Sequence, residues 1–420
     1  NICVVGGGYI GLPLAVAFVK KKIQVTLYDI NKKRIDSLKN NIDYNNETNL
    51  RDIKQLKKIN FTNKINDIKN SNIYIVTTPT PVTKYNKPDL TYIKSASKSV
   101  GLNLKKNDLV IYESTVYPGL TENICLPLLE KYSKLSCSGK KLTEDVFHLG
   151  YSPERINPGD KKHTLEKISK IVSSNNIQIS KFLKKLYKEI IMAKVVIAKD
   201  IKTAEAAKVI ENTQRDINIA FINELSILFN KLNITTSDVL NVANTKWNFL
   251  NFKPGLVGGH CIGVDPYYLT HCANQFNIKS NVILSGRKIN NFMPKFIVNC
   301  FNDLIKSKKI KGKNILIFGA TFKENCNDTR NSKSIELANI LNEKNFNINF
   351  FDPYVKKNRI DQFRNVKFIK KNYYSAFFFN VKHDTFLKFD IKKLRNYLKE
   401  NGIILDIQNI FSSSKTDFCL

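Results

Sequence analysis

Apolar runs and polar turns alternate at the start of the chain in the order expected of an α/β fold. Residues 1–5 are mainly apolar and predict a buried strand, which a glycine-rich turn at 6–11 follows. A helix is predicted from residue 12 to about 20, and a second strand covers 24–29 and ends in Asp29. This order of strand, glycine turn, helix, strand and acid is typical of one half of a dinucleotide-binding sheet.

Three later apolar runs each lead directly into a polar loop. They predict strands at 73–76, 109–112 and 146–149. Ligands of parallel α/β sheets bind beyond the carboxyl ends of the strands, so we expect a ligand site along this edge.

The rest of the chain predicts a helical spine and a second αβ unit. Helical periodicity runs from about residue 203 to 231, long enough to bridge two domains. A strand and turn at 313–320, a helix at 334–343 and a strand at 347–352 repeat the opening plan without its second and third glycines. We therefore predict an α/β protein with two Rossmann-like, doubly wound parallel-sheet domains joined by a long central helix. The expected domains are 1–195, 196–295 and 296–420.

Charge and cysteine content narrow the class of protein. The 420 residues include 67 Lys and Arg against 36 Asp and Glu, a formal net charge of +31. Because the lysines are strewn along the whole chain, we favour a uniformly basic surface over a nucleic-acid-binding face, which stays an alternative. The eight cysteines lack metal or disulfide spacing, so we expect no metal and a reducing, cytoplasmic location. No apolar run of about 18 residues predicts a membrane span.

The glycine turn is the first candidate site. Gly6, Gly8 and Gly11, with Tyr9 and Ile10 between them, allow a tight turn and close approach of a phosphate to a helix N-terminus. Asp29 can accept hydrogen bonds from a ribose hydroxyl, which favours NAD over NADP, although Arg34 lies nearby. The alternative is a glycine turn that only allows the helix to pack closely and binds no phosphate.

Cys261 is the second candidate, because it lies in a Gly-Gly-His-Cys loop whose small neighbours leave the sulfur reachable. An inert buried cysteine is the competing interpretation, and Asp265 nearby shifts the balance toward a reactive one. His260 has no partner at metal-ligand spacing and is interpreted as structural.

Lys208 and Asn212 share one face of the long helix and could hold a developing oxyanion. The alternative is a Glu205–Lys208 pair on a solvated face. Thr115 and Glu154 are polar residues at strand ends.

The loop around Cys261 resembles that of the UDP-glucose/GDP-mannose dehydrogenase family, and more narrowly the UDP-N-acetylglucosamine 6-dehydrogenases of Vi-antigen and capsule synthesis. Residues 254–269, Pro-Gly-Leu-Val-Gly-Gly-His-Cys-Ile-Gly-Val-Asp-Pro-Tyr-Tyr-Leu, carry the most specific likeness. The resemblance extends nearly end to end. It includes the opening glycines, 78–81, 114–116, 153–160, 208–212, 223–225, 322–323 and 328–332.

This resemblance implies oxidation of a sugar C6 alcohol to the carboxylate with two NAD⁺. Cys261 would attack the intermediate aldehyde and carry a thiohemiacetal and then a thioester. Lys208 and Asn212 match oxyanion contacts. Asp265 and a water near Thr115 match the proton-handling group, and Glu154 matches the acid of thioester hydrolysis.

The resemblance also implies binding roles and an assembly. The matched NAD contacts are Gly6, Gly8, Tyr9, Ile10, Gly11, Asp29, Arg34, Thr80, Thr115 and Arg330. The matched UDP-sugar contacts are Glu154, Arg155, Asn157, Lys208, Asn212, Phe252, Gly255, Gly258 and Lys323. The C-terminal domain would bind the UDP moiety, and a homodimer through the long helix is expected.

Three alternatives stay open on sequence. UDP-N-acetylgalactosamine or UDP-glucose could be the substrate. The oxidation could stop at the aldehyde after two electrons. The chain could also be a non-catalytic or nucleic-acid-binding relative.

Overall fold

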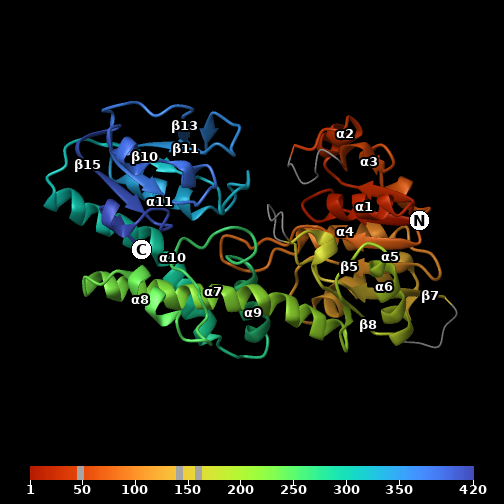
Figure 1. The fold of residues 1–420 in the computed structure, drawn as a ribbon. Coiled ribbons are helices and arrows are strands. Elements are labelled where there is room, and N and C mark those ends of the chain that lie inside the picture. The colour runs from red at the N-terminus through yellow and green to blue at the C-terminus, as the bar shows by residue number, and fades with distance from the viewer. Residues whose placement is uncertain (45–51, 139–144, 157–162) are drawn as a thin grey trace. The chain divides into compact units, whose positions relative to one another are not determined.

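The computed structural model describes residues 1–44, 52–138, 145–156 and 163–420. These residues form two compact units, a first unit of 1–211 and 267–278 and a second unit of 212–266 and 279–420 (Figure 1). Helix α7 (Ile201–Lys231) begins in the first unit and ends in the second as one continuous helix. The predicted architecture of two α/β sheets with a long central helix is therefore confirmed, whereas the predicted domain boundaries stay predictions.

The sheet of the first unit runs in the order β3-β2-β1-β4-β5-β7-β8-β9, with β6 beside β7. Every pairing between these strands is parallel except that of β7 with β8. The parallel order 3-2-1-4-5 is that of the first five strands of a dinucleotide-binding sheet, so the carboxyl ends of β1, β4 and β5 share one edge. The strands are β1 (Ile2–Val5), β2 (Val25–Tyr28), β3 (Asn60–Thr62), β4 (Ile73–Val76), β5 (Leu109–Tyr112), β6 (Ser136–Cys137), β7 (Val146–Tyr151), β8 (Lys170–Ser174) and β9 (Val195–Ile197).

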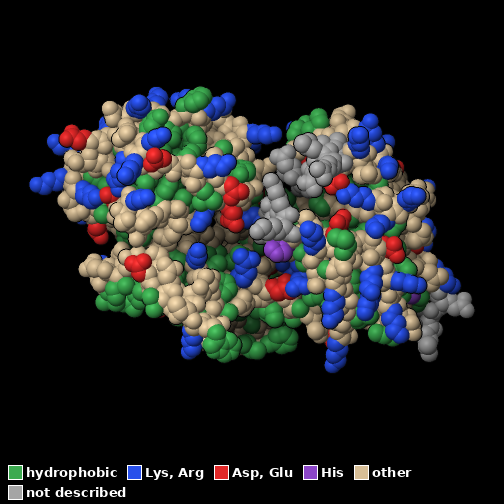
Figure 2. Space-filling model, viewed as in Figure 1, with side chains coloured by type: hydrophobic (Ala, Val, Ile, Leu, Met, Phe, Trp, Pro, Cys, Tyr) green, Lys and Arg blue, Asp and Glu red, His purple; other side chains and the backbone are tan. Residues whose placement is uncertain are grey.

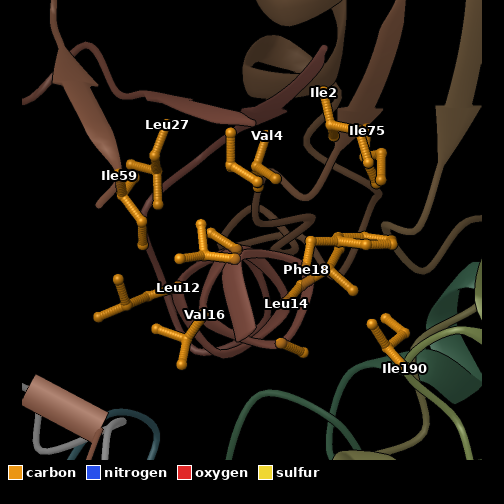
Figure 3. Packing of buried hydrophobic residues seen from close by; sticks show 14 of the residues in the cluster. Ile2, Val4, Leu12, Leu14, Val16, Phe18, Leu27, Ile59, Ile75 and Ile190 are labelled. Atoms are coloured by element: carbon orange, nitrogen blue, oxygen red, sulfur yellow. The ribbon is translucent and has the colours of Figure 1, made fainter. Parts of the chain in front are cut away.

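Helix α1 (Gly11–Lys20) is the centre of the core of the first unit. It is buried along its length except at Pro13 and Lys20, as expected of a helix that is apolar all round. Figure 3 shows its side chains packed with Val4, Leu27 and Ile75 of the neighbouring strands. This packing fixes the helix N-terminus against the end of β1. The other helices are α2 (Lys32–Lys39), α3 (Ile53–Leu56), α4 (Thr91–Gly101), α5 (Leu126–Ser133) and α6 (Ile177–Lys188).

The second unit contains a sheet in the order β12-β13-β11-β10-β14-β15-β16. Only β12 and β13 pair in antiparallel fashion among these strands of the described chain. Phenylalanines fill one face of this sheet, with Phe318 and Phe379 stacked at a centroid distance of 4.2 Å. The strands are β10 (Asn314–Phe318), β11 (Asn347–Phe351), β12 (Arg359–Ile360), β13 (Phe363–Asn365), β14 (Tyr374–Phe379), β15 (Leu398–Asp406) and β16 (Phe418–Cys419). The helices after α7 are α8 (Thr236–Ala243), α9 (Asp265–Asn274), α10 (Asn281–Ser307), α11 (Lys333–Glu343) and α12 (Ile391–Arg395).

Basic side chains cover the surface without a single patch on the side that Figure 2 shows. Lys and Arg are spread over the visible face of each unit and alternate with Asp and Glu. Among the described residues, no helix combines the length and the apolar character that crossing a membrane would need.

Candidate functional site

The glycine turn after β1 leaves room above the start of α1. Gly6 has φ +110°, and a Cβ on Gly11 would lie 1.9 Å from the Gly6 carbonyl oxygen, so glycine is needed at both positions. A Cβ on Gly8 would meet no atom of the described residues within 4 Å. Within the described residues, the N-cap residue of α1, Ile10, makes no side-chain capping hydrogen bond, and Tyr9 and Ile10 are half-buried. The turn therefore fits an anionic group that approaches the helix N-terminus.

Asp29 and Arg34 hold this turn from below. The Gly7 N–H donates to Asp29 Oδ2 at 2.7 Å, and the Asn31 N–H donates to Asp29 Oδ1 at 2.8 Å. The buried Arg34 guanidinium donates from Nε to the Gly7 carbonyl at 2.8 Å and pairs with Asp43 at 2.8 Å. Arg34 thus contacts the protein rather than standing free for a 2′-phosphate, which agrees with NAD.

The loops after β4 and β5 are tied together beside the turn. Ser114 Oγ donates to the Thr78 carbonyl at 2.7 Å, and Tyr268 of α9 donates to the Pro81 carbonyl at 3.1 Å. Thr80 and Thr115, the two threonines predicted as NAD contacts, lie in these loops and are half-buried. The edge of the sheet therefore presents polar loops where the sequence predicted a ligand.

Glu154, after β7, belongs to a buried charged cluster that sequence reasoning missed. Lys170 at the start of β8 donates to Glu154 Oε2 at 2.7 Å and to Glu113 Oε2 at 2.9 Å. Tyr187 of α6 donates a hydrogen bond to Glu113 Oε1. Two carboxylates share one ammonium group here, and all four side chains are buried. The only sequence signal for this cluster was Lys170, a charged residue at the first position of a short apolar strand.

The two carboxyl groups of this cluster differ in proton affinity. Burial raises the pKa of Glu113 to about 7, although Lys170 opposes the shift. Burial also opposes ionisation of Glu154, but Lys170 and the N–H groups of Arg155 and Ile156 outweigh it and hold its pKa below the usual value. Glu154 is therefore the stronger acid of the two, and Glu113 is the group that takes up a proton first as pH falls through neutrality.

Arg155 is directed toward α7. Its guanidinium makes an ion pair with Glu211 at 2.7 Å and donates to the Ser169 carbonyl at 2.9 Å. Asn157, the other predicted substrate contact on this loop, lies outside the described residues.

The prediction of a solvated Glu205–Lys208 pair as the alternative on α7 is wrong. Glu205 is fully buried and accepts hydrogen bonds from the N–H groups of Gly119 at 2.5 Å and Thr121 at 2.9 Å. Lys208 is also buried, with 8% of its surface exposed. Burial raises the pKa of Glu205 to about 7. Glu205 therefore anchors the loop after β5. The sequence prediction failed because helical spacing shows which residues share a face of the helix but not which segment covers that face.

The second unit contains the cysteine loop. Cys261 is half-buried, and its carbonyl accepts hydrogen bonds from the N–H groups of Val264 at 3.0 Å and Asp265 at 2.9 Å. Asp265 opens α9, and its Oδ2 accepts from Asn212 Nδ2 at 2.5 Å. The amide of Asn212, predicted to hold the oxyanion, is thus in direct contact with the carboxylate of Asp265, predicted to handle the proton.

The remaining predicted residues of the second unit surround this loop. Arg330 pairs with Asp328 at 2.7 Å, and Lys323 lies 5.7 Å above the ring of Phe322. His260 packs edge-on against Phe322, and burial lowers its pKa. Phe252 and Gly258 are half-buried, and Gly255 is buried. No group of His, Cys, Asp and Glu within the described segments could hold a metal ion.

The predicted residues therefore divide between the two units. The glycine turn, Asp29, Arg34, Thr80, Thr115, Glu154, Arg155 and Lys208 lie in the first unit. Asn212, Phe252, Gly255, Gly258, Cys261, Asp265, Lys323 and Arg330 lie in the second. The roles predicted for them stay predictions.

Known proteins match this chain along nearly its whole length. Residues 1–191 match the NAD binding domain of the UDP-glucose/GDP-mannose dehydrogenase family, residues 202–292 its central domain and residues 316–413 its UDP binding domain. The chain is 45% identical to the UDP-N-acetyl-D-glucosamine 6-dehydrogenase of Salmonella typhi, over 99% of this chain and 98% of that protein. It is 46% identical to Protein CapL of Staphylococcus aureus, over 99% and 97%. The solved UDP-D-ManNAc dehydrogenase of Pyrococcus horikoshii superposes with a TM-score of 0.87 at 28% identity and covers 100% of this chain and 98% of that one.

Proposed function

The chain belongs to the UDP-glucose/GDP-mannose dehydrogenase family and is an NAD-dependent nucleotide-sugar dehydrogenase, and from that premise we propose that it oxidises the C6 hydroxyl of UDP-N-acetylglucosamine to the uronate. The observation that carries this choice of sugar is the 45% identity to a UDP-N-acetyl-D-glucosamine 6-dehydrogenase over nearly the full length of both chains. The uronate would serve synthesis of a surface polysaccharide. UDP-N-acetylmannosamine is a second candidate, because a UDP-D-ManNAc dehydrogenase shares the fold at 28% identity.

In this proposal the glycine turn holds the cofactor. The glycine turn and the N-terminus of α1 would hold the pyrophosphate of NAD, and Asp29 would accept hydrogen bonds from its ribose hydroxyls. Bound NAD⁺ supplies the acceptor for the hydride at each of the two oxidations. Thr80 and Thr115 line the same edge of the sheet, and Arg34 keeps the turn in shape.

The chain itself supplies the covalent chemistry. Cys261 attacks the aldehyde carbon as a thiolate and keeps the substrate attached until water cleaves the thioester. Lys208 and Asn212 stabilise the oxyanion, and Asp265 accepts the proton that leaves the alcohol. Glu154 directs the hydrolytic water, for which a carboxylate is required. The lowered pKa of Glu154 supports this assignment.

The proposed reaction is tested by counting NADH formed per UDP-N-acetylglucosamine consumed, with UDP-N-acetylgalactosamine, UDP-N-acetylmannosamine and UDP-glucose alongside. We expect two NADH per sugar and the highest kcat/KM for UDP-N-acetylglucosamine. One NADH per sugar would mean that oxidation stops at the aldehyde. Turnover of none of the four sugars by folded, NAD-binding protein would contradict the proposal.

Two glycine variants separate cofactor contact from folding. Gly8→Ala should leave stability within about 0.5 kcal/mol of wild type, because the new methyl group meets no atom within 4 Å in the described part of the chain. It should weaken NAD binding at least about tenfold by occupying the space for the pyrophosphate. Gly11→Ala, the matched change, should cost about 3 kcal/mol, because its methyl group overlaps the Gly6 carbonyl. Calorimetric NAD titration and thermal unfolding check both. Wild-type NAD affinity in Gly8→Ala would refute this placement.

We also propose a cytoplasmic homodimer that pairs through α7. Three apolar side chains spaced seven and four residues apart, Phe221, Leu228 and Leu232, are at least half exposed. Phe221 and Leu228 lie on one face of α7 and Leu232 directly follows its last residue, so these exposed apolar side chains suit a second copy of the same end of the helix. Sedimentation at micromolar concentration that gave a single species of 48.1 kDa would contradict the dimer.

A further inference from the structure

The loop that carries Cys261 has no regular secondary structure of its own between Phe252 and Gly263 in the described chain. It includes four glycines, which have the largest conformational freedom to lose on folding. A defined path for this backbone therefore needs contacts from outside the loop. Two asparagines provide them, one at each end of the stretch 255–259.

Asn223 of α7 holds the first end. The Gly255 N–H donates to Asn223 Oδ1 at 2.8 Å, and Asn223 Nδ2 donates back to the Gly255 carbonyl at 3.0 Å. Asn223 is fully buried. Its amide therefore satisfies both backbone groups of Gly255, as a neighbouring strand would.

A chain of buried polar groups fixes the direction of this amide. Asn223 Nδ2 also donates to Asn290 Oδ1 at 2.8 Å, and Asn290 Nδ2 donates to Asp216 Oδ1 at 2.7 Å. Arg287 donates to the same Asp216 oxygen at 2.6 Å. Because a carboxylate only accepts, it orients the Asn290 amide, which in turn orients that of Asn223. The Asn223 side chain can therefore face Gly255 in one orientation only, with its oxygen toward the Gly255 N–H and its nitrogen toward the Gly255 carbonyl.

Asn331 holds the second end of this stretch, at Gly259, which lies two residues before Cys261. Its carbonyl accepts from the Gly259 N–H at 3.0 Å, and its Nδ2 donates to the Gly259 carbonyl at 2.7 Å. Asn331 has φ 50°, a left-handed conformation that asparagine tolerates. A Cβ on Gly258 would lie 2.4 Å from the Asn331 carbonyl oxygen, so the close approach also requires the small residue there.

We propose that Asn223 and Asn331 are positioning residues of the dehydrogenase reaction. Asn223 sets the backbone at Gly255, where the sugar nucleotide binds, and Asn331 sets the backbone at Gly259, which aims Cys261. Neither side chain needs to touch the substrate. The inference rests on the proposed function, which gives the loop its substrate and Cys261 its role.

The test uses Asn223→Asp and Asn331→Asp in the full chain. Each change keeps the shape but turns the Nδ2 donor into an oxygen that faces a glycine carbonyl. Hydrogen exchange in peptides spanning 250–262 should become at least about tenfold faster at the affected amide. Asn223→Asp should raise KM for UDP-N-acetylglucosamine about tenfold with little change in kcat, whereas Asn331→Asp should lower kcat about tenfold with little change in KM. NAD affinity should stay at the wild-type value in both.

Matched controls exclude general damage. Ser226→Ala removes a buried hydroxyl one turn along α7 that donates to the Asn223 carbonyl, and it should leave exchange and kinetics unchanged. Asn325→Asp makes the same chemical change at another asparagine with a left-handed backbone conformation. The side-chain oxygen of Asn325 accepts from the Asp384 N–H, and an aspartate keeps that acceptor, so this variant should also leave exchange and kinetics unchanged. If Asn223→Asp fails to fold, Asn223→Ser removes the amide without adding a charge and should give the same rise in KM.

The outcomes separate this inference from the proposed function. Unchanged exchange in both variants, or faster exchange with wild-type KM and kcat, would overturn it. If wild type oxidises no UDP-sugar, the proposed function fails, and the alkylation rate of Cys261 by iodoacetamide decides instead. A rate altered by Asn331→Asp but not by Asn223→Asp would still support the positioning of Cys261, and equal rates in all three proteins would overturn it.

Discussion

Replacing Cys261 with serine is expected to lower uronate formation from UDP-N-acetylglucosamine by about 10³-fold or more, the scale seen when a covalent nucleophile is removed. Serine keeps the size of the side chain but is a weak nucleophile at neutral pH. The aldehyde can then form but has no sulfur to hold it for the second oxidation. The NADH yield should therefore fall from two per sugar to one or less, measured by absorbance together with chromatography of the product.

A second cysteine provides the control for this result. Cys300 of α10 lies in the same unit and is half-buried, and burial raises the pKa of its thiol to about 11. Cys300→Ser should leave both the NADH yield and the rate at wild-type values. Retention of two NADH per sugar in Cys261→Ser would rule out the thioester mechanism.

Local pattern was enough to predict the elements that position the site. The strands at 73–76 and 109–112 have the predicted ends, and α7 begins two residues before the predicted start at 203. These elements were accessible because apolar periodicity and glycine turns act over a few residues. Strand β14, Tyr374–Phe379, was not predicted, although its six residues are all buried.

The contacts that organise the site could not be predicted in the same way. Lys170 meets Glu113 across 57 residues of sequence, and Asn212 meets Asp265 across 53. The first contact depends on where β8 joins the sheet, including its antiparallel pairing with β7. Local sequence pattern does not encode such strand pairings. From the pattern alone Glu154 was therefore one polar residue at a strand end, and its contact with Lys170 was not predicted.

Lys170→Met is expected to destabilise the chain by about 3–5 kcal/mol at pH 8.0, because it leaves the two buried carboxyl groups of Glu113 and Glu154 without a cation. The loss should depend on pH in a defined direction. Burial is the largest cause acting on both groups, so the loss of Lys170 should raise both folded pKa values, and the folded variant should then bind more protons than the unfolded chain as pH rises past the ordinary carboxyl range. Stability then falls as pH rises above that range. The deficit should be about 2 kcal/mol larger at pH 8.0 than at pH 5.5, measured by guanidinium unfolding followed by circular dichroism.

Two further variants show whether charge is the cause of this loss. Adding Glu113→Gln to Lys170→Met removes one of the two carboxyl groups while an amide oxygen still accepts from Tyr187, so it should restore stability at pH 8.0 and little at pH 5.5. Lys20→Met breaks an ion pair with Asp52 whose side chains are 35% and 20% exposed, and it should cost less than about 1 kcal/mol at either pH. An equal deficit of Lys170→Met at both pH values would mean that the lysine stabilises through its packed methylene groups. A pH-dependent deficit would instead show that the charge of Lys170 stabilises the ionised carboxyl groups of Glu113 and Glu154.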